Sequence, residues 1–191
     1  MLSPTERLPL PSFDTMSEAQ RTAANELIAG PRKGVKGPFI PLLRSPELMS
    51  RLQKVGEYLR FHSAVPPRIA EFATLCVARA WSQQFEWGMH VPLALKAGTA
   101  KETVDAIHEG CRPSSMAPAE AVVHDFISEL TNTRGVAQAT YDSVVRELSE
   151  QGLIDLLGII GYFTSMCMVL NVARTPPESA NDIELLPKFP R

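Results

Sequence analysis

Apolar residues recur along most of this chain at intervals of three and four positions, which is the spacing of one face of an α-helix. In the segment "PPRIAEFATLCVARAW", Ile69, Ala73 and Cys76 follow this spacing. Strict alternation of apolar and polar residues, which marks a half-buried strand, is almost absent. The pattern therefore predicts an all-α protein.

Capping residues and helix breakers divide the chain into about seven to eight predicted helices. Thr15 and Glu18 form a capping-box pattern for the first helix, and Thr99 and Glu102 form a second one later. The first helix ends at residue 30, and the others run from 46 to 60, 66 to 81, 83 to 98, 99 to 110, 117 to 131, 137 to 149 and 153 to 173. Pro92 lies inside a predicted helix, so we expect a kink or a restart there.

Two segments outside the helices are rich in proline. Residues 30–41, "GPRKGVKGPFIP", hold three glycines and three prolines and should form an irregular loop. Long loops of this kind are often functional, as a lid or an intersubunit arm for example. Residues 174–191 should form an extended tail lying over a surface. The length fits a single domain, 1–191, with residues 1–45 as an N-terminal extension.

Composition narrows the classes of partner. The net charge is −2 and there is no run of Lys or Arg, so we expect no nucleic-acid partner. Cys76, Cys111 and Cys167 are odd in number and widely spaced, which fits neither a disulfide framework nor a zinc site. The first residues lack the pattern of a signal peptide. These features predict a protein of the reducing cytoplasm.

The most apolar stretch runs from residue 153 to residue 173, long enough to be tested as a membrane span. Asp155 near its start and Asn171 near its end interrupt the apolar run. We therefore interpret it as a core helix and expect no membrane partner. Its apolar surface exceeds what a chain of this length easily buries, which predicts a homo-oligomer.

Four residues of the predicted helix 83–98 point to chemistry. Gln83, Glu86, Trp87 and His90 fall at i, i+3, i+4 and i+7, so they share one stripe. The Glu86 carboxylate can approach the His90 ring, raise its pKa and prepare an acid or base. Trp87 would keep water out. The same spacing also fits an ordinary surface pair beside a core tryptophan, and spacing alone leaves both interpretations open.

Glu71 joins this stripe if the helices 66–81 and 83–98 fold back as a hairpin. Two carboxylates and one imidazole would then meet in a mostly apolar setting, an arrangement suited to proton transfer. Alternatively, Glu71 is exposed and pairs with Arg68 three positions earlier. The remaining histidines lack acidic partners at ligand spacing, so we predict no metal site.

The stretch "RIAEFATLCVARAWSQQFEWGMHVPLALKAGTAKETVDAI" resembles the carboxymuconolactone decarboxylase family of the AhpD-like superfamily. The resemblance rests on Glu71, a spacer of 14 residues, E-W-x-x-H at Glu86 to His90, and "ALKAG" at 94–98. It is strongest over residues 66–110. It implies an AhpD-like helical bundle that assembles as a dimer, trimer or hexamer.

The peroxidase branch of this superfamily uses a C-x-x-C-x-x-x-H helix, and this chain has Gln83 and Glu86 at the cysteine positions. The resemblance therefore implies the decarboxylase-like branch, which acts on small carboxylated lactones of aromatic catabolism without metal or organic cofactor. His90 would donate the proton, Glu86 would orient it, and Glu71 would act as a second acid or base.

Other residues are expected to contact the substrate. Gln83 and Trp87 should line the site. A substrate carboxylate also requires a cation, and the candidates by position are Arg44, Arg68 and Arg79. Lactone hydrolysis or isomerisation at the same residues remains an alternative reaction, and an oligomeric ligand-binding protein without activity remains an alternative class.

Overall fold

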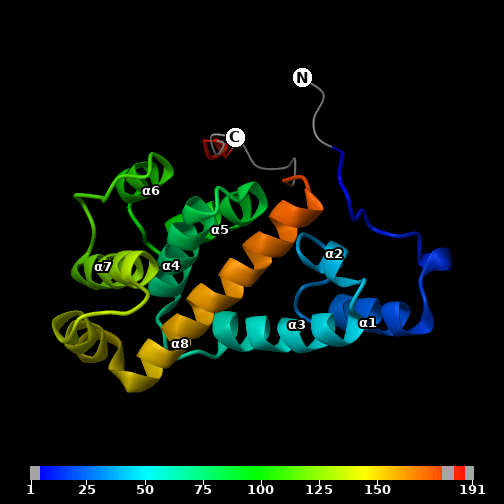
Figure 1. Cartoon of the computed structure of the whole chain (residues 1–191), viewed down its shortest axis with the longest axis horizontal. Helices are drawn as coiled ribbons and strands as arrows, with labels where there is room; N and C mark the ends of the chain where they lie inside the picture. The colour runs from blue at the N-terminus through cyan, green and yellow to red at the C-terminus, as the bar shows by residue number, and fades with distance from the viewer. Residues whose placement is uncertain (1–4, 178–182, 188–191) are drawn as a thin grey trace.

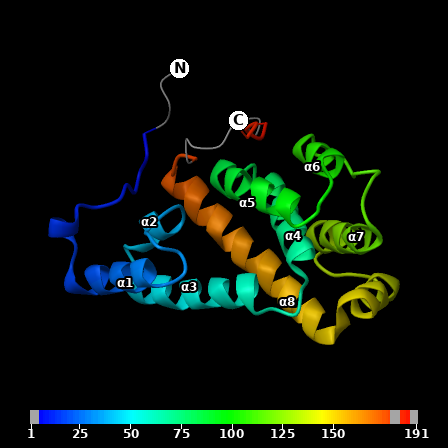
Figure 2. The same cartoon turned by 180° about the vertical axis from the view of Figure 1, so that it is seen from behind.

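The computed structural model describes residues 5–177 and 183–187. Within these ranges all regular secondary structure is helical. Figure 1 and, from behind, Figure 2 show α8 crossing the molecule, with α1 to α3 on one side and α4 to α7 on the other. The elements are a 3-10 helix η1 (Phe13–Thr15) and the α-helices α1 (Glu18–Ala29), α2 (Phe39–Leu42), α3 (Pro46–Phe61), α4 (Pro67–Ala80), α5 (Gln84–Lys96), α6 (Lys101–His108), α7 (Pro118–Thr133) and α8 (Gln138–Ala173). The predicted fold class is confirmed.

Helix α4 is the centre of one half of the core. It contacts α5, α6, α7 and α8, and its residues Phe72, Ala73 and Leu75 are completely buried. Alanines on α4 leave room for neighbouring helices to approach closely. Ser82, with a φ of 43°, reverses the chain between α4 and α5. The hairpin predicted from the sequence is therefore present.

Helix α8 contains the two helices predicted for residues 137–149 and 153–173. The break between them falls at Ser149, whose φ of 68° is not helical. Beyond this residue, Leu156, Met166 and Leu170 are almost completely buried. By length and composition α8 could cross a membrane, but 56% of its most apolar 18-residue stretch is buried inside the protein. Its contacts with α3, α4 and α7 are those of a core helix.

Three local predictions were wrong, and of the kink or restart expected at Pro92 the restart is absent. The first capping box is formed by Ser17 and Gln20 rather than by Thr15 and Glu18, because the Thr15 hydroxyl binds the Ser12 carbonyl instead. Helix α6 has Ala100 at its N-cap and no side-chain cap. Helix α5 continues through Pro92 without a restart. The predicted irregular loop contains the short helix α2 at its end.

Within the C-terminal tail, the described residues 183–187 have no regular structure and lie over α5 and α6. Gln84 exchanges two hydrogen bonds of 2.8 Å with the backbone of Leu186. His108 Nε2 lies 3.0 Å from the Leu185 carbonyl. The tail therefore covers a surface, as predicted, and residues 178–182 and 188–191 lie outside the described part.

Candidate active site

The candidate site begins at the N-terminus of α5. Gln83 is the N-cap, and its Oε1 accepts hydrogen bonds from the backbone N–H groups of Phe85 and Glu86, at 2.5 and 3.1 Å. Its amide nitrogen donates to Asn171 of α8 at 3.2 Å. Since these bonds fix the first turn of α5, Gln83 positions Glu86 and does not line the cavity described below.

His90 lies between two carboxylates. Its Nδ1 is 2.6 Å from Glu71 Oε2, across the α4–α5 hairpin, and its Nε2 is 3.4 Å from Glu86 Oε2, one turn earlier on α5. The ring meets Phe163 of α8 edge to face, with 4.9 Å between the centroids. The structure thus brings together the three residues that the sequence singled out.

This arrangement sets the charge of His90. Burial lowers the pKa of the imidazole, but the hydrogen bonds and negative charges of Glu71 and Glu86 outweigh burial and raise it to about 9. At neutral pH His90 is therefore an imidazolium with a proton on both nitrogens. The contact at Nε2 is longer than a normal hydrogen bond, so this proton is the more loosely held of the two.

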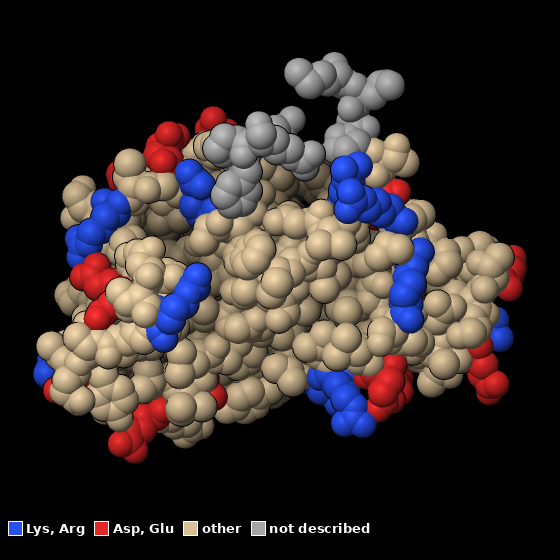
Figure 3. Space-filling view, in the orientation of Figure 1, with Lys and Arg blue, Asp and Glu red and all other residues tan. Residues whose placement is uncertain are grey.

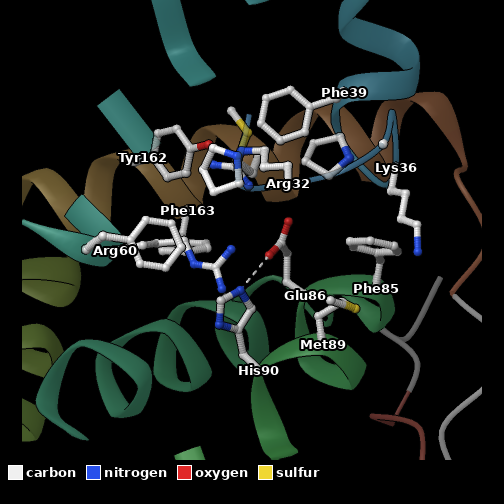
Figure 4. A pocket seen from close by; sticks show the side chains of 15 residues that line it. Arg32, Lys36, Phe39, Arg60, Phe85, Glu86, Met89, His90, Tyr162 and Phe163 are labelled. Atoms are coloured by element: carbon white, nitrogen blue, oxygen red, sulfur yellow. Dashed lines mark ion pairs between the residues drawn. The ribbon is translucent and has the colours of Figure 1, made fainter. Parts of the chain in front are cut away.

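A cavity of about 250 Å³ opens next to this cluster. Figure 4 shows Glu86 and His90 on its floor, with the dashed line marking their ion pair. The wall comes from α8 and the end of α3, and the roof comes from residues 31–39. Glu86 lines the cavity, whereas Glu71 lies behind the His90 ring. Glu71 is thus placed to orient the ring and Glu86 to face a ligand, the reverse of the roles expected from the sequence.

Aromatic rings make up much of the lining. They are Phe39, Phe61, Phe85, Tyr162 and Phe163. Two glycines allow this packing. A Cβ on Gly37 would lie 2.3 Å from the Phe85 ring, and one on Gly56 would lie 2.2 Å from the Tyr162 hydroxyl. Gly37 also has a φ of 52°, which favours glycine. The roof and wall therefore fit closely around a mostly apolar space.

None of the three predicted arginines lines this cavity. Arg44 donates to the carbonyls of residues 8, 9 and 40. Arg68 pairs with the buried Glu120 at 2.9 Å, and the Arg79 Nε donates to the His108 carbonyl at 2.7 Å. Each guanidinium is already used to join segments of the fold.

Two other arginines, Arg32 and Arg60, line the cavity instead. Sequence reasoning missed both. Arg32 lies in the glycine- and proline-rich loop, which was marked as functional without a residue being chosen. Arg60 lies in the last turn of α3, where nothing in the helical pattern distinguishes it from a solvated charge.

Trp87 does not contact the cavity. It is 2% exposed, and its Nε1 donates to the carbonyl of Glu184 in the tail at 3.1 Å. Its ring lies 5.7 Å from that of His108. Trp87 therefore packs behind the site, where it joins α5 to the tail and to α6.

No thiol lines the cavity. Burial raises the pKa of Cys76 to about 12 and raises that of Cys167 as well, so both stay protonated and unreactive at neutral pH. Within the described ranges, no group of three or more His, Cys, Asp and Glu side chains is arranged to hold a metal ion. Both His90 nitrogens already face carboxylates.

Comparison with known proteins supports the fold. No curated protein is similar enough in sequence to count as a match. Among solved structures, an alkylhydroperoxidase AhpD core, an uncharacterized peroxidase-related protein from Ralstonia eutropha JMP134, has a TM-score of 0.75 at 14% identity, covering 92% of this chain and 94% of that one. An AhpD-type antioxidant-defence candidate of unknown function from Agrobacterium tumefaciens has a TM-score of 0.64 at 12% identity, covering 75% and 99%.

A third similar structure is the debrominase Bmp8, as a cysteine-to-alanine variant in complex with 2,3,4-tribromopyrrole. Its TM-score is 0.65 at 15% identity, covering 92% of this chain and 93% of that one. The sequence itself matches the model of the carboxymuconolactone decarboxylase family over residues 46–124, a range that includes Glu71, Glu86 and His90. The recognition made from the sequence is thus confirmed: residues 46–124 match the carboxymuconolactone decarboxylase family, within an AhpD-like helical fold.

Proposed function

We propose that this protein is a carboxy-lyase that removes CO2 from a small carboxylated lactone or related cyclic carboxylate, without a cofactor, in the catabolism of aromatic compounds. One observation carries the proposal. His90 lies between Glu71 and Glu86, which raise its pKa to about 9, and its Nε2 side is at the floor of a cavity of about 250 Å³. A positioned acid beside an apolar cavity is what proton delivery to carbon requires.

The reaction divides into two steps. As the bond from the ring carbon to the carboxylate breaks, CO2 leaves, and its electron pair passes into the conjugated ring carbonyl as an enolate. The carbon then takes the Nε2 proton of His90, which gives the product and a neutral imidazole. A proton from the solvent then restores the imidazolium. Overall, one carboxylate and one proton are consumed, and CO2 and the product with a new C–H bond are formed.

The protein's own groups favour the first step. The Glu86 carboxylate lines the cavity, and a leaving carboxylate placed near it and among phenylalanines loses solvation and meets a like charge. Loss of CO2 removes this unfavourable charge. Glu71 acts behind the ring, because its bond to Nδ1 keeps Nε2 directed towards the cavity and stabilises the charged form.

The comparisons agree with a substrate of this size. Among the similar structures, the debrominase binds the one-ring compound 2,3,4-tribromopyrrole. A cavity of about 250 Å³ lies just below the usual range for ligand sites, roughly 300–1,000 Å³. Debromination by a cavity thiol is not supported, because no thiol lines the cavity.

Lactone hydrolysis at the same site is less well supported. Hydrolysis requires a general base that activates water, and an imidazolium with a pKa of about 9 has no free nitrogen at neutral pH. This role would fall to the Glu86 carboxylate, which is already paired with His90. Isomerisation needs the same acid as decarboxylation, and it differs in retaining CO2. The product analysis below separates these reactions.

The proposal includes a cytoplasmic homo-oligomer, whether a dimer, trimer or hexamer. Helix α8 exposes apolar side chains along one side, among them Ile154, Leu157, Met168 and Val172. In Figure 3, the middle of the face seen in the view of Figure 1 carries few charged side chains. A second copy of the chain would cover such a surface.

The test measures CO2 release, and incorporation of solvent deuterium at carbon, from a panel of carboxylated lactones. We expect turnover by the native protein, almost none by His90→Ala, and a loss of about 100-fold or more for Glu86→Gln. His124→Ala is the matched control, because His124 lies on α7, which contributes no residue to the cavity lining. No CO2 from any lactone, with the fold intact by circular dichroism, would reject the proposed reaction.

A further inference from the structure

We propose that Arg32 and Arg60 form a carboxylate-binding subsite, which holds an anionic group that the substrate keeps throughout the reaction and so selects which compounds bind. The inference rests on the proposed function for the use of the cavity as a substrate site. It extends that function to two residues that the sequence did not single out.

The first support is an unmet capacity for hydrogen bonds. The Nη2 atom of Arg32 and the Nε atom of Arg60 are both buried without any hydrogen-bond partner among the described residues. Buried N–H groups are almost always paired, because an unpaired one forfeits its bonds with water and gains nothing in return. A ligand oxygen in this cavity would supply the missing acceptor.

The second support is a surplus of positive charge. Arg32 and Arg60 line the cavity along with the His90 imidazolium, while Glu86 is the only acidic residue among the described residues of the lining. Neither Arg32 nor Arg60 forms an ion pair with a described carboxylate, although Glu57 and Glu86 act on Arg32 from further away. Burial lowers the pKa of Arg32, and the nearby charge of Arg60 lowers it further. An anion bound between the two guanidinium groups would relieve this repulsion.

The guanidinium groups are held in place before a ligand arrives. Arg32 lies over the Phe39 ring at 4.5 Å, and Arg60 lies over the Phe61 ring at 5.2 Å. Such cation–π contacts orient a guanidinium without using its hydrogen-bond donors. Guanidinium also matches the planar, two-oxygen geometry of a carboxylate better than any other side chain does.

The position of the pair indicates which group of the substrate it holds. Figure 4 shows both guanidinium groups reaching into the space above Glu86 and His90. An ion pair with the carboxylate that departs would stabilise its charge and slow the loss of CO2. The pair therefore suits an oxygen that remains charged, while the departing carboxylate lies by Glu86. We place a single ring between these two ends, in a cavity of about 250 Å³.

The test measures binding and needs no turnover. Benzoate, 2-furoate and cyclohexanecarboxylate, together with their neutral amides, are titrated into the full-length protein at low salt by calorimetry. We expect at least one carboxylate to bind, with its amide weaker by tenfold or more. Arg32→Gln and Arg60→Gln should each weaken carboxylate binding by about tenfold or more, and should leave the weak amide binding unchanged. Arg51→Gln is the control, because Arg51 is exposed on α3 and pairs with Glu47.

The variants are expected to fold, because each removes an unpaired buried donor and loses only one cation–π contact, with Phe39 or Phe61. Their thermal midpoints confirm this, and a carboxylate should raise the midpoint of the native protein but not of the arginine variants. Equal affinity for carboxylate and amide, no binding of any carboxylate, or full carboxylate affinity in both arginine variants would overturn the inference. Carboxylate binding without CO2 release would leave the subsite standing and reject the lyase. CO2 release with an unaltered KM in Arg32→Gln and Arg60→Gln would support the lyase and reject the subsite.

Discussion

Glu71 and His90 are 19 positions apart in the chain, yet Oε2 of one lies 2.6 Å from Nδ1 of the other. This contact joins α4 to α5 and leaves the opposite side of the imidazole ring directed at the cavity. A carboxylate behind an imidazole fixes its orientation and favours its charged form. The relationship therefore sets both the direction and the acidity of the proposed proton donor.

The first prediction concerns the charge of His90. In a titration followed by NMR, the His90 ring should change protonation at a pH of about 9. Glu71→Gln should lower this pKa, because it removes the stronger of the two carboxylate contacts. If His90 is the acid, the rate should fall as the pH rises through this pKa, and the fall should move to lower pH in the variant. Unchanged profiles in Glu71→Gln would show that this contact does not set the acidity.

The second prediction concerns stability against pH. His90 has a folded pKa of about 9, above its unfolded value of 6.5, so its contribution is complete below pH 6.5 and is lost as the pH rises to 9. At 1.36 kcal/mol per pKa unit the loss is about 3 kcal/mol. Urea unfolding between pH 6.5 and 9.5 should show this decline in the native protein. In His90→Gln the decline should be smaller by that amount, and parallel curves would contradict the assigned pKa.

The third prediction concerns the packing of Gly56 against Tyr162. Alanine is ordinarily better than glycine inside a helix by about 0.5–1 kcal/mol. At position 56 the added Cβ would lie 2.2 Å from the Tyr162 hydroxyl, so overpacking should prevail and Gly56→Ala should destabilise by about 1–3 kcal/mol. The matched variant is Gly88→Ala, where nothing lies within 4 Å of the new Cβ. It should be neutral or stabilising in the same denaturation assay.

The fourth prediction separates a structural from a substrate-binding role for Arg68. The Glu120 side chain is completely buried, and it binds both Arg68 and the backbone N–H of Ala117. Arg68→Gln should lower the free energy of unfolding by about 1–3 kcal/mol, because it leaves this carboxylate without its cation. If the proposed activity is present, the KM of the remaining folded protein should not change. A raised KM at unchanged stability would restore Arg68 to the substrate site.

The fifth prediction concerns the exposed side of α8. If copies of the chain meet there, Leu157→Glu should reduce the mass measured by light scattering after size-exclusion chromatography. Ile28→Glu adds the same charge at an exposed position on α1 and should leave the mass unchanged. A monomeric native protein, or equal masses for all three, would count against assembly through α8.

The sequence predicted the parts of the site that depend on local geometry. Glu86 and His90 are one helical turn apart, so their contact follows from the helix alone. Glu71 required only one further assumption, the hairpin between two adjacent helices. The all-α fold followed in the same way from apolar spacing.

The parts that failed depend on how distant segments meet. Arg32 lies in a loop without periodicity, and only the folded chain shows that this loop closes over α5. Arg68 and Arg32 look alike as sequence, but one faces the buried Glu120 and the other the cavity. Likewise, spacing could place Glu86 near His90 but could not show which carboxylate faces the ligand. Two neighbouring hydroxyls could have capped the first helix, and spacing did not show that Ser17 rather than Thr15 is the N-cap residue.

The roof of the cavity comes from residues 31–39, which precede the range 46–124 that contains Glu71, Glu86 and His90. On the proposed function, the acid–base cluster lies within the matched range, whereas selectivity comes from both stretches, because Arg32 is in the roof and Arg60 is in the range 46–124. An exchange of the roof alone would give an altered choice of compound while the proton donor and its partners stay intact. We therefore expect proteins with the same E-W-x-x-H helix to differ in substrate when this roof differs. Exchanging the roof between such proteins is then a direct way to change selectivity.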